Sequence, residues 1–255
     1  MNHSSSHYHA ALYMYNDLNK AEFVLENFKL HNPDISITVY NGGDTQPHLV
    51  EKYGVELIEG PNLASKHTRE RKGGYSFNLT WFNNFYGLAE KYNPDYMLFL
   101  ETDVKCSSKI TIDPIYDIAG PMHRAGPMEE LLIYDYWVNF VNDLQPIGGY
   151  ASPFTELNQS RWPHRFHTGM GGTAFSRTFF EKTKDKLYLV KNCFEDMALW
   201  FHHDVIVSCL ARHCGCTIGD WRDVTDTRGS LRFINDQWHN FPYEPDCALA
   251  HSWKI

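Results

Sequence analysis

The stretch that decides the fold is Tyr96-Met97-Leu98-Phe99-Leu100-Glu101-Thr102-Asp103. Residues 96–100 form a continuous apolar run, which is typical of a strand buried in a parallel sheet. Ligands of open α/β sheets bind beyond the carboxyl ends of the strands, and Glu101 and Asp103 come directly after this run. Because residues two apart on an extended backbone point the same way, both carboxylates can face one site; the alternative is an acidic turn without a ligand. A hard cation such as Mg²⁺ or Mn²⁺ would join the two carboxylates through their oxygens.

Strand-like and helix-like segments alternate before this stretch. Short apolar runs that end in turn residues predict strands at residues 10–15, 35–40 and 55–58. Between the strands, apolar residues at helical spacing predict helices around residues 21–28 and 76–92. Strands separated by helices imply parallel pairing with right-handed crossovers. We therefore predict an α/β fold in which helices flank a mainly parallel central sheet.

The second half of the chain is less regular. Its patterns predict a helix at residues 128–141, a loop-rich segment over 145–163, a strand at 173–176, a helix capped by Thr178 and a further helix at 195–212. No segment has the composition of a flexible linker, and no internal repeat is present. The sequence thus predicts a disordered segment over residues 1–8 and a single domain over residues 9–255.

Composition excludes several classes of partner. The 255 residues include 23 Lys and Arg against 31 Asp and Glu, so the formal net charge is −8. Nucleic acids and anionic membranes attract a basic face, which this balance does not favour. The chain has no apolar run of the roughly 18 residues that a membrane span needs, its first residues lack the apolar core of a signal peptide, and its six cysteines are too dilute for a disulfide scaffold. We therefore expect a cytoplasmic protein without a membrane span.

With Glu101-Thr102-Asp103 after a buried strand, the chain resembles the GT-A class of nucleotide-sugar glycosyltransferases. In that class a D-x-D metal motif follows a strand of a nucleotide-binding α/β sheet; here Glu stands in the first position. The resemblance implies that Asp103 binds Mn²⁺ or Mg²⁺ directly, and that Glu101 contacts the ribose, or the metal through water. It also implies a nucleotide-sugar donor, with a UDP-sugar favoured, and a glycan or glycoprotein acceptor.

Three further segments follow in the order that the class shows. Gly171-Gly172-Thr173-Ala174 resembles the glycine-rich segment beside the donor sugar, although a tight turn explains it equally well. Phe194-Glu195-Asp196 resembles the x-E-D motif, which implies that Asp196 and Glu195 are catalytic and that Asp196 is the base of an inverting enzyme. In a retaining enzyme Asp196 would only position the acceptor, and a third alternative is that both acids only stabilise a helix N-terminus. His251 resembles the C-terminal histidine that returns to the metal, and Lys254 could neutralise the leaving diphosphate.

The same resemblance implies a donor site at the carboxyl ends of the first strands. The lobe that binds the nucleotide sugar would span residues 9–105, and an acceptor-binding and catalytic lobe would span residues 106–255. Residues that could contact the base, ribose, diphosphate or sugar are Tyr13, Tyr15, Asn41, Asp44, Arg71, Asn78 and Thr102. Arg71 lies in the only dense basic cluster before the metal motif, and that cluster can also be a solvated loop.

Two other functions compete with this interpretation. A catalytically silent sugar- or nucleotide-binding module would use the same fold without turnover. A zinc-binding protein would use the dense potential ligands His202, His203, Cys209, His213, Cys214 and Cys216. Their spacing lacks the paired halves of known zinc motifs, and most of them lie along one predicted helix.

Overall fold

The computed structural model describes residues 7–14, 18–43, 47–60, 75–106, 108–112, 116–120, 123–124, 166–167, 171–188, 207, 210–211, 214–220, 231–233 and 249–251. The backbone alone is described for residues 75–80, 123–124, 166–167, 219–220, 231–233 and 249–251. The helix predicted at residues 128–141 lies outside these ranges. Of the helix predicted at residues 195–212, the described positions Val207, Leu210 and Ala211 are helical and fully buried.

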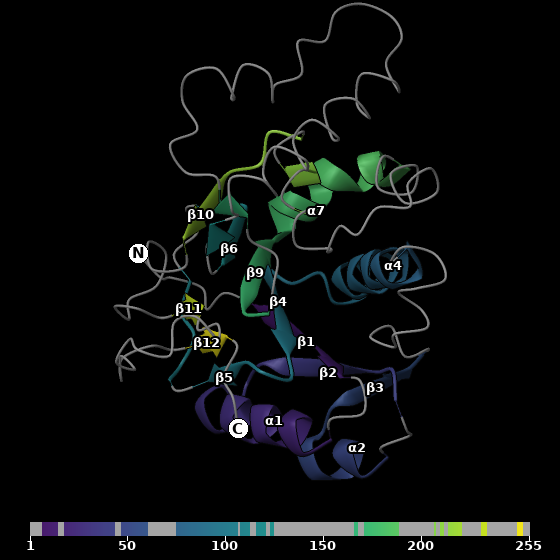
Figure 1. Ribbon diagram of the computed structural model, residues 1–255, viewed down its shortest axis with the longest axis vertical. Coiled ribbons are helices and arrows are strands. Elements are labelled where there is room, and N and C mark those ends of the chain that lie inside the picture. The colour runs from purple at the N-terminus through teal and green to yellow at the C-terminus, as the bar shows by residue number, and fades with distance from the viewer. Residues whose placement is uncertain are drawn as a thin grey trace, which may run out of the picture.

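The described strands form a central seven-stranded sheet with the order β10-β6-β9-β4-β1-β2-β3 (Figure 1). Its members are β1 (Tyr8–Met14), β2 (Ser36–Asn41), β3 (Glu56–Glu59), β4 (Tyr96–Glu101), β6 (Ile118–Gly120), β9 (Thr173–Ser176) and β10 (Ile218–Asp220). Among these strands only β9 is antiparallel to its neighbours, β4 and β6. The prediction of a mainly parallel central sheet is confirmed.

Helices cover both faces of this sheet (Figure 1). On one face, α1 (Leu18–His31) and α2 (Pro47–Tyr53) close an aliphatic core, into which α1 buries Ala21, Val24, Leu25 and Phe28. On the other face, α4 (Tyr75–Tyr92) and α7 (Arg177–Thr183) close an aromatic core. In that core the rings of Trp81 and Phe85 stack with their centroids 4.7 Å apart. The apolar spacing in the sequence correctly predicted α1 and α4, because burial against a sheet requires one apolar face.

Two local predictions need correction or addition. The helix after β9 is capped by Ser176 rather than Thr178, because the Ser176 hydroxyl accepts a hydrogen bond of 3.1 Å from the Phe179 amide. Helix α2 has no counterpart among the predicted elements, although Pro47 in its first position suits a helix start. None of the helices among the described residues combines the length and the apolar character that crossing a bilayer requires.

Two small sheets complete the described structure. One joins β11 (Leu231–Phe233), β12 (Leu249–His251) and β5 (Lys105–Cys106), and the other joins β7 (His123–Arg124) and β8 (Phe166–His167). The first matters most for function, because β5 begins two residues after Asp103. It therefore brings the C-terminal strand β12 close to the predicted metal motif.

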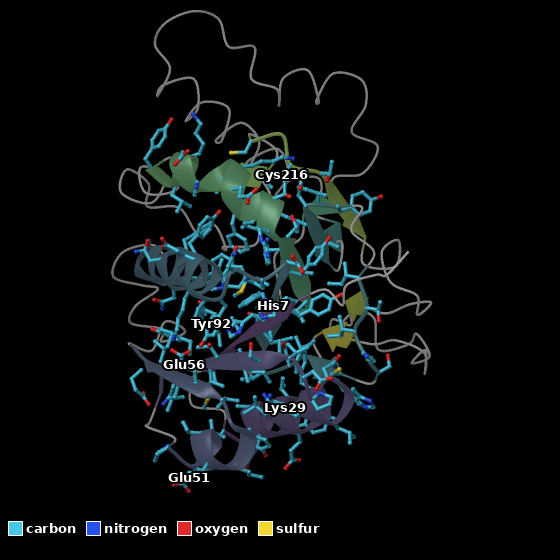
Figure 2. The ribbon with its side chains drawn as sticks, turned by 180° about the vertical axis from the view of Figure 1, so that it is seen from behind. His7, Lys29, Glu51, Glu56, Tyr92 and Cys216 are labelled. Carbon is cyan, nitrogen blue, oxygen red and sulfur yellow. The ribbon has the colours of Figure 1, made fainter. Side chains whose placement is uncertain are left out.

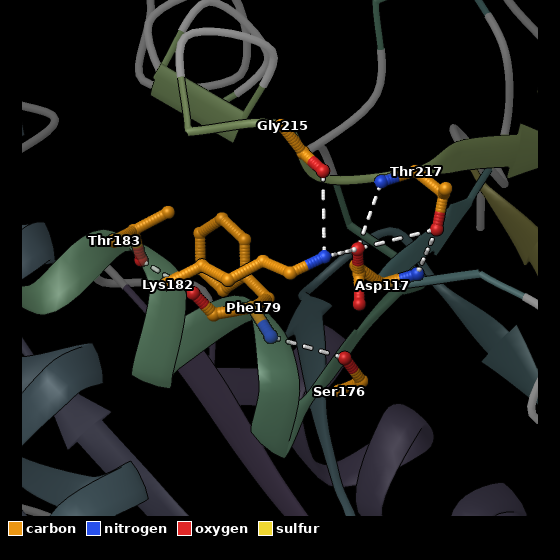
Figure 3. A network of polar contacts seen from close by, with 7 residues as sticks. All are labelled: Asp117, Ser176, Phe179, Lys182, Thr183, Gly215 and Thr217. Atoms are coloured by element: carbon orange, nitrogen blue, oxygen red, sulfur yellow. Dashed lines mark hydrogen bonds and ion pairs between the residues drawn. The ribbon is translucent and has the colours of Figure 1, made fainter.

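An ion pair fastens the β6–β10 edge of the central sheet (Figure 3). One carboxylate oxygen of Asp117, Oδ2, accepts hydrogen bonds of 2.8 Å from both the Lys182 ammonium and the Thr217 amide. The Thr217 hydroxyl accepts a hydrogen bond of 2.9 Å from the Asp117 amide. Asp117 is 8% exposed, and its hydrogen bond raises the pKa of Lys182. These bonds tie α7 to the starts of β6 and β10.

A fully buried histidine lies at the amino end of β1. Its ring nitrogens form hydrogen bonds of 2.6 Å with the Ser36 hydroxyl and 3.0 Å with the Thr38 hydroxyl. The ring of His9 also stacks on Tyr92, with centroids 3.7 Å apart, and the Tyr92 hydroxyl donates to Glu56 (Figure 2). Burial lowers the pKa of His9 from 6.5 to about 4, so the ring is neutral at pH 7.

Candidate functional site

The carboxyl end of β4 meets the glycine segment through two hydrogen bonds. Glu101, the last residue of β4, accepts a hydrogen bond of 2.7 Å on Oε2 from the Gly171 amide. The Gly172 amide donates a 2.6 Å hydrogen bond to the carbonyl of Phe99, two residues earlier on the same strand. Two motifs that lie 70 residues apart in the chain are therefore in direct contact. The sequence predicted that both motifs belong to a ligand site, but it did not predict the contact between them.

Only glycine fits at position 171. A β-carbon there would lie 2.7 Å from the Glu101 carboxylate oxygen and 2.8 Å from the Val104 side chain. Val104 is 1% exposed and cannot move aside without disturbing the core. Gly172 has a φ of +91°, a backbone conformation that side chains with a β-carbon rarely adopt. Both glycines are thus explained by the tight turn that leads into β9, and this turn brings backbone close to Glu101.

Thr102 and Asp103 form the turn that follows β4. The Val104 amide closes this turn with a 3.1 Å hydrogen bond to the Glu101 carbonyl. Glu101, Thr102 and Asp103 are each partly exposed, so their side chains reach solvent although the strand before them is buried. Carboxylate groups on both sides of one turn, open to solvent, can approach a cation together.

The small sheet brings His251 next to this turn. In the antiparallel pairing of β12 with β5, Leu249 lies opposite Cys106 and Ala250 lies opposite Lys105 (Figure 1). His251 is the next residue after Ala250 and ends β12, and β5 begins two residues after Asp103, so the antiparallel pairing puts the His251 end of β12 toward the turn. The tertiary structure thus brings the backbone of a predicted metal ligand from the far end of the chain to the metal motif.

The residues at this turn suit a hard divalent cation. Carboxylate oxygens are the ligands that Mg²⁺ and Mn²⁺ prefer, and a histidine nitrogen is acceptable to Mn²⁺. In the described part of the chain, no three His, Cys, Asp or Glu side chains form a metal-binding group. The side chain of His251 is outside that part, so its coordination stays a prediction.

Tyr13 and Asn41 lie at the same edge of the sheet as Glu101. The register pairs Tyr13 with Glu101 and Met14 with Asn41. Tyr13 is 1% exposed and stacks on Tyr40 with a centroid separation of 5.1 Å, and burial raises the pKa of its hydroxyl. Asn41 is fully buried, and its side chain already bonds protein groups on both ends. The side chains of both residues are therefore buried beneath this edge of the sheet and are not exposed to solvent.

The structure places a further acidic residue, Glu59, at this edge of the sheet; it is not among the site residues predicted from the sequence. Glu59 ends β3, lies opposite Asn41 and is exposed. Its Oε2 accepts a 3.0 Å hydrogen bond from the Asn41 side-chain amide. Glu59 directly follows the strand predicted at residues 55–58, just as Glu101 directly follows the strand predicted at residues 96–100, so the same rule could have identified it.

Several predicted site residues lie outside the described residues. These are Tyr15, Asp44, Arg71, Glu195, Asp196 and Lys254. Asn78 lies in the first turn of α4, where only the backbone is described. Their roles stay predictions.

The zinc alternative involves two cysteines that the structure describes. Cys214 and Cys216 are free thiols on either side of Gly215. Burial raises the pKa of Cys214, and it raises that of Cys216 to about 12. Zinc binds thiolates, so these surroundings favour two structural thiols over ligands.

Comparison with known proteins supports the fold. No protein-family model matches the chain, and neither does any curated protein sequence. Among solved structures, it is similar to core-mannan synthase A (CmsA/Ktr4) from Aspergillus fumigatus, which was crystallised in a form with Mn and GDP. The TM-score is 0.55 and the sequence identity 10%, over 88% of this chain and 75% of the other. This likeness and the strand order together show the predicted α/β fold of GT-A type.

Proposed function

We propose that the chain is a metal-dependent glycosyltransferase that moves a sugar from a nucleotide-sugar donor to a hydroxyl group of a glycan or glycoprotein. The observation that carries this proposal is the contact between Glu101 and Gly171, which joins an acidic strand end to a glycine turn. A glycosyltransferase needs both parts, because the acids hold a cation for the diphosphate and the glycines let the sugar approach the backbone. A fold shared with a mannan synthase that binds Mn and GDP supports the same function.

The proposed roles follow from charge development during transfer. A bound Mn²⁺ or Mg²⁺ would stabilise the leaving diphosphate as a Lewis acid. Asp103 and His251 would hold it, with Glu101 in support; the proposal is supported by the pairing of β12, which ends at His251, with β5, which begins two residues after Asp103. Lys254, three residues after His251, would neutralise further charge on the diphosphate.

We further propose an inverting mechanism in which Asp196 takes the proton of the acceptor hydroxyl as that oxygen attacks the sugar. Glu195 would belong to the same catalytic motif. The resemblance to the GT-A class favours a UDP-sugar as the donor.

A thermal-shift screen tests the proposal directly. The full chain is heated with UDP-, GDP-, CMP- and dTDP-sugars, each with and without Mn²⁺. A donor at 100 times its Kd stabilises the folded state by about 2.7 kcal/mol, so one nucleotide class should raise the Tm only when metal is present. The variant Asp103→Asn should remove that shift.

Two results would count against the proposal. If no nucleotide sugar raises the Tm in a metal-dependent way, the chain has no donor site of this kind. If a donor binds but neither hydrolysis nor transfer of its sugar is detected with Mn²⁺, the chain is the silent binding module described above.

A further inference from the structure

Glu59 presents a fixed carboxylate at the carboxyl edge of the sheet. The Asn41 amide holds its Oε2 at 3.0 Å, and the other carboxylate oxygen, Oε1, has no hydrogen-bond partner among the described residues. The side chain is exposed, although the asparagine that holds it is fully buried. A carboxylate that is held by a buried group and open to solvent is prepared to accept hydrogen bonds.

The orientation of Asn41 is set by its own surroundings. Its side-chain oxygen accepts a 3.1 Å hydrogen bond from the Gly43 amide, so the nitrogen must face Glu59. Its backbone carbonyl accepts a 3.0 Å hydrogen bond from the Gly60 amide, which fixes the end of β3 beside the end of β2. The position of the Glu59 carboxylate is therefore determined by the sheet and not by a free side-chain rotation.

The distance from Glu59 to the metal motif suits the base of a nucleotide. In the order β4-β1-β2-β3, the strand of Glu59 is three positions from the strand of Glu101. Neighbouring strands are spaced by about 4.8 Å, so the two strand ends are about 14 Å apart. In a nucleoside diphosphate the base is at one end, the phosphates are at the other and the ribose lies between them. With the diphosphate at Asp103, the part that reaches β3 is the base.

Guanine is the base whose hydrogen-bond pattern matches a carboxylate. It presents two adjacent donors, N1–H and the N2 amino group, which can bind the two carboxylate oxygens in parallel. Adenine and cytosine each pair an amino donor with a ring acceptor. Uracil has a single donor, N3–H, and the carbonyl oxygens on both sides of it repel a carboxylate.

On these grounds we propose that Glu59 recognises guanine and makes the donor a GDP-sugar. This inference rests on the proposed function, and it replaces the UDP-sugar that the resemblance favoured. Gly60 follows Glu59 directly, and a β-carbon there would lie 2.1 Å from the Tyr40 hydroxyl oxygen. The backbone after Glu59 is thus packed closely against β2, which keeps this edge in one conformation.

The test measures the Kd of GDP, IDP, UDP and ADP for the full chain with Mn²⁺ by titration calorimetry. IDP has the N1–H of GDP but lacks the N2 amino group. The wild type should bind GDP at least about tenfold more tightly than UDP or ADP, with IDP between, because guanine can donate two hydrogen bonds to the charged carboxylate and the base of IDP can donate one. Glu59→Gln should raise the Kd of GDP by about tenfold or more and leave the Kd values of UDP and ADP unchanged.

Glu51→Gln is the matched control, because Glu51 is an exposed glutamate on the neighbouring helix α2 (Figure 2). It should leave all four Kd values unchanged, and both variants should keep the wild-type Tm. Equal weakening of all four nucleotides by Glu59→Gln would show that Glu59 binds the ribose and would overturn the inference. Metal-dependent binding with no preference for GDP would overturn it while leaving the proposed function intact. Absence of binding by every nucleotide would overturn both.

Discussion

The Glu101 carboxylate accepts a 2.7 Å hydrogen bond from the Gly171 amide, so the acidic strand end and the glycine turn form one unit. This bond engages Oε2 of Glu101 and orients the carboxylate. A carboxylate that is already held in this way loses little further side-chain entropy when it binds a ligand.

Gly171→Ala should damage the site through steric overlap. The added methyl group would lie 2.7 Å from Glu101 Oε2 and 2.8 Å from Val104, so the turn or the carboxylate must move. Overpacking of this kind costs about 1–3 kcal/mol of unfolding free energy. We expect a lower Tm and a loss of metal-dependent donor binding. As a control, Gly87→Ala on α4 meets nothing within 4 Å and should stabilise the helix by about 1 kcal/mol. Unchanged donor binding in Gly171→Ala would show that the turn is not part of the site.

Glu101→Gln separates the charge of Glu101 from its hydrogen bond. The glutamine oxygen can still accept from the Gly171 amide, so the unfolding free energy should stay within about 1 kcal/mol of wild type. Groups that support a metal typically change its affinity by about 10–100-fold, and we expect a loss of Mn²⁺ affinity in that range. Mn²⁺ titration followed by electron paramagnetic resonance, with nucleotide present, measures it. If the Mn²⁺ affinity is unchanged, Glu101 serves only to hold the glycine turn.

Asp196→Asn tests the proposed base. General-base catalysis contributes about 10²–10⁴-fold, so transfer should slow by a factor in that range while donor affinity stays at the wild-type value. Initial rates at saturating donor and acceptor, together with calorimetric titration of the nucleotide, separate the two effects. Near-full turnover would show that another group takes the acceptor proton.

The buried His9 should make the stability depend on pH. Its folded-state pKa of about 4 is below the ordinary 6.5, so between these values the unfolded chain binds a proton that the folded chain does not. Stability from this residue is therefore complete above pH 6.5 and decreases as the pH falls toward 4, by about 3 kcal/mol in total. Urea unfolding at a series of pH values measures it. His9→Gln should flatten the curve between pH 4 and 6.5, and an unchanged slope in that variant would contradict the assignment.

The Asp117 network should respond unequally to removal of its two charges. Asp117→Ala deletes the acceptor of two 2.8 Å hydrogen bonds and leaves the Thr217 amide without its partner. We expect a loss of about 2–4 kcal/mol of unfolding free energy. Lys182 is 37% exposed at its side chain, so Lys182→Met should cost only about 1 kcal/mol. Equal losses, measured from urea unfolding midpoints with an unchanged m-value, would mean that the ion pair dominates over the amide contact.

Much of the first hundred residues could be predicted from the sequence alone. The apolar run at residues 96–100 is β4, and the helical spacing of Ala21, Val24, Leu25 and Phe28 is the buried face of α1. These patterns predict the elements correctly because a buried strand must be apolar throughout and a helix that packs against a sheet must be apolar on one side. The prediction of a metal motif at Glu101 and Asp103 used the same rule, since polar residues after a buried strand come at the edge where parallel sheets bind ligands.

Local competition accounts for what sequence reasoning missed in the fold. Ser176 and Thr178 are both good caps, and the choice depends on which hydroxyl reaches a free amide in the folded chain. Likewise, the sequence did not show that the Asn41 side chain is buried and forms hydrogen bonds with Glu59 and the Gly43 amide. Such outcomes depend on neighbours that are distant in sequence.

Local patterns alone predicted a mainly parallel α/β sheet with Glu101 and Asp103 at the carboxyl end of a buried strand, because periodicity and strand ends are local properties of the chain. Only the tertiary structure decided which distant residues join them. Gly171 reaches Glu101 because β9 runs antiparallel to β4, and His251 comes beside the turn because β12 pairs with β5. Strand pairing across 70 residues or more depends on packing of the whole core, which no short pattern records.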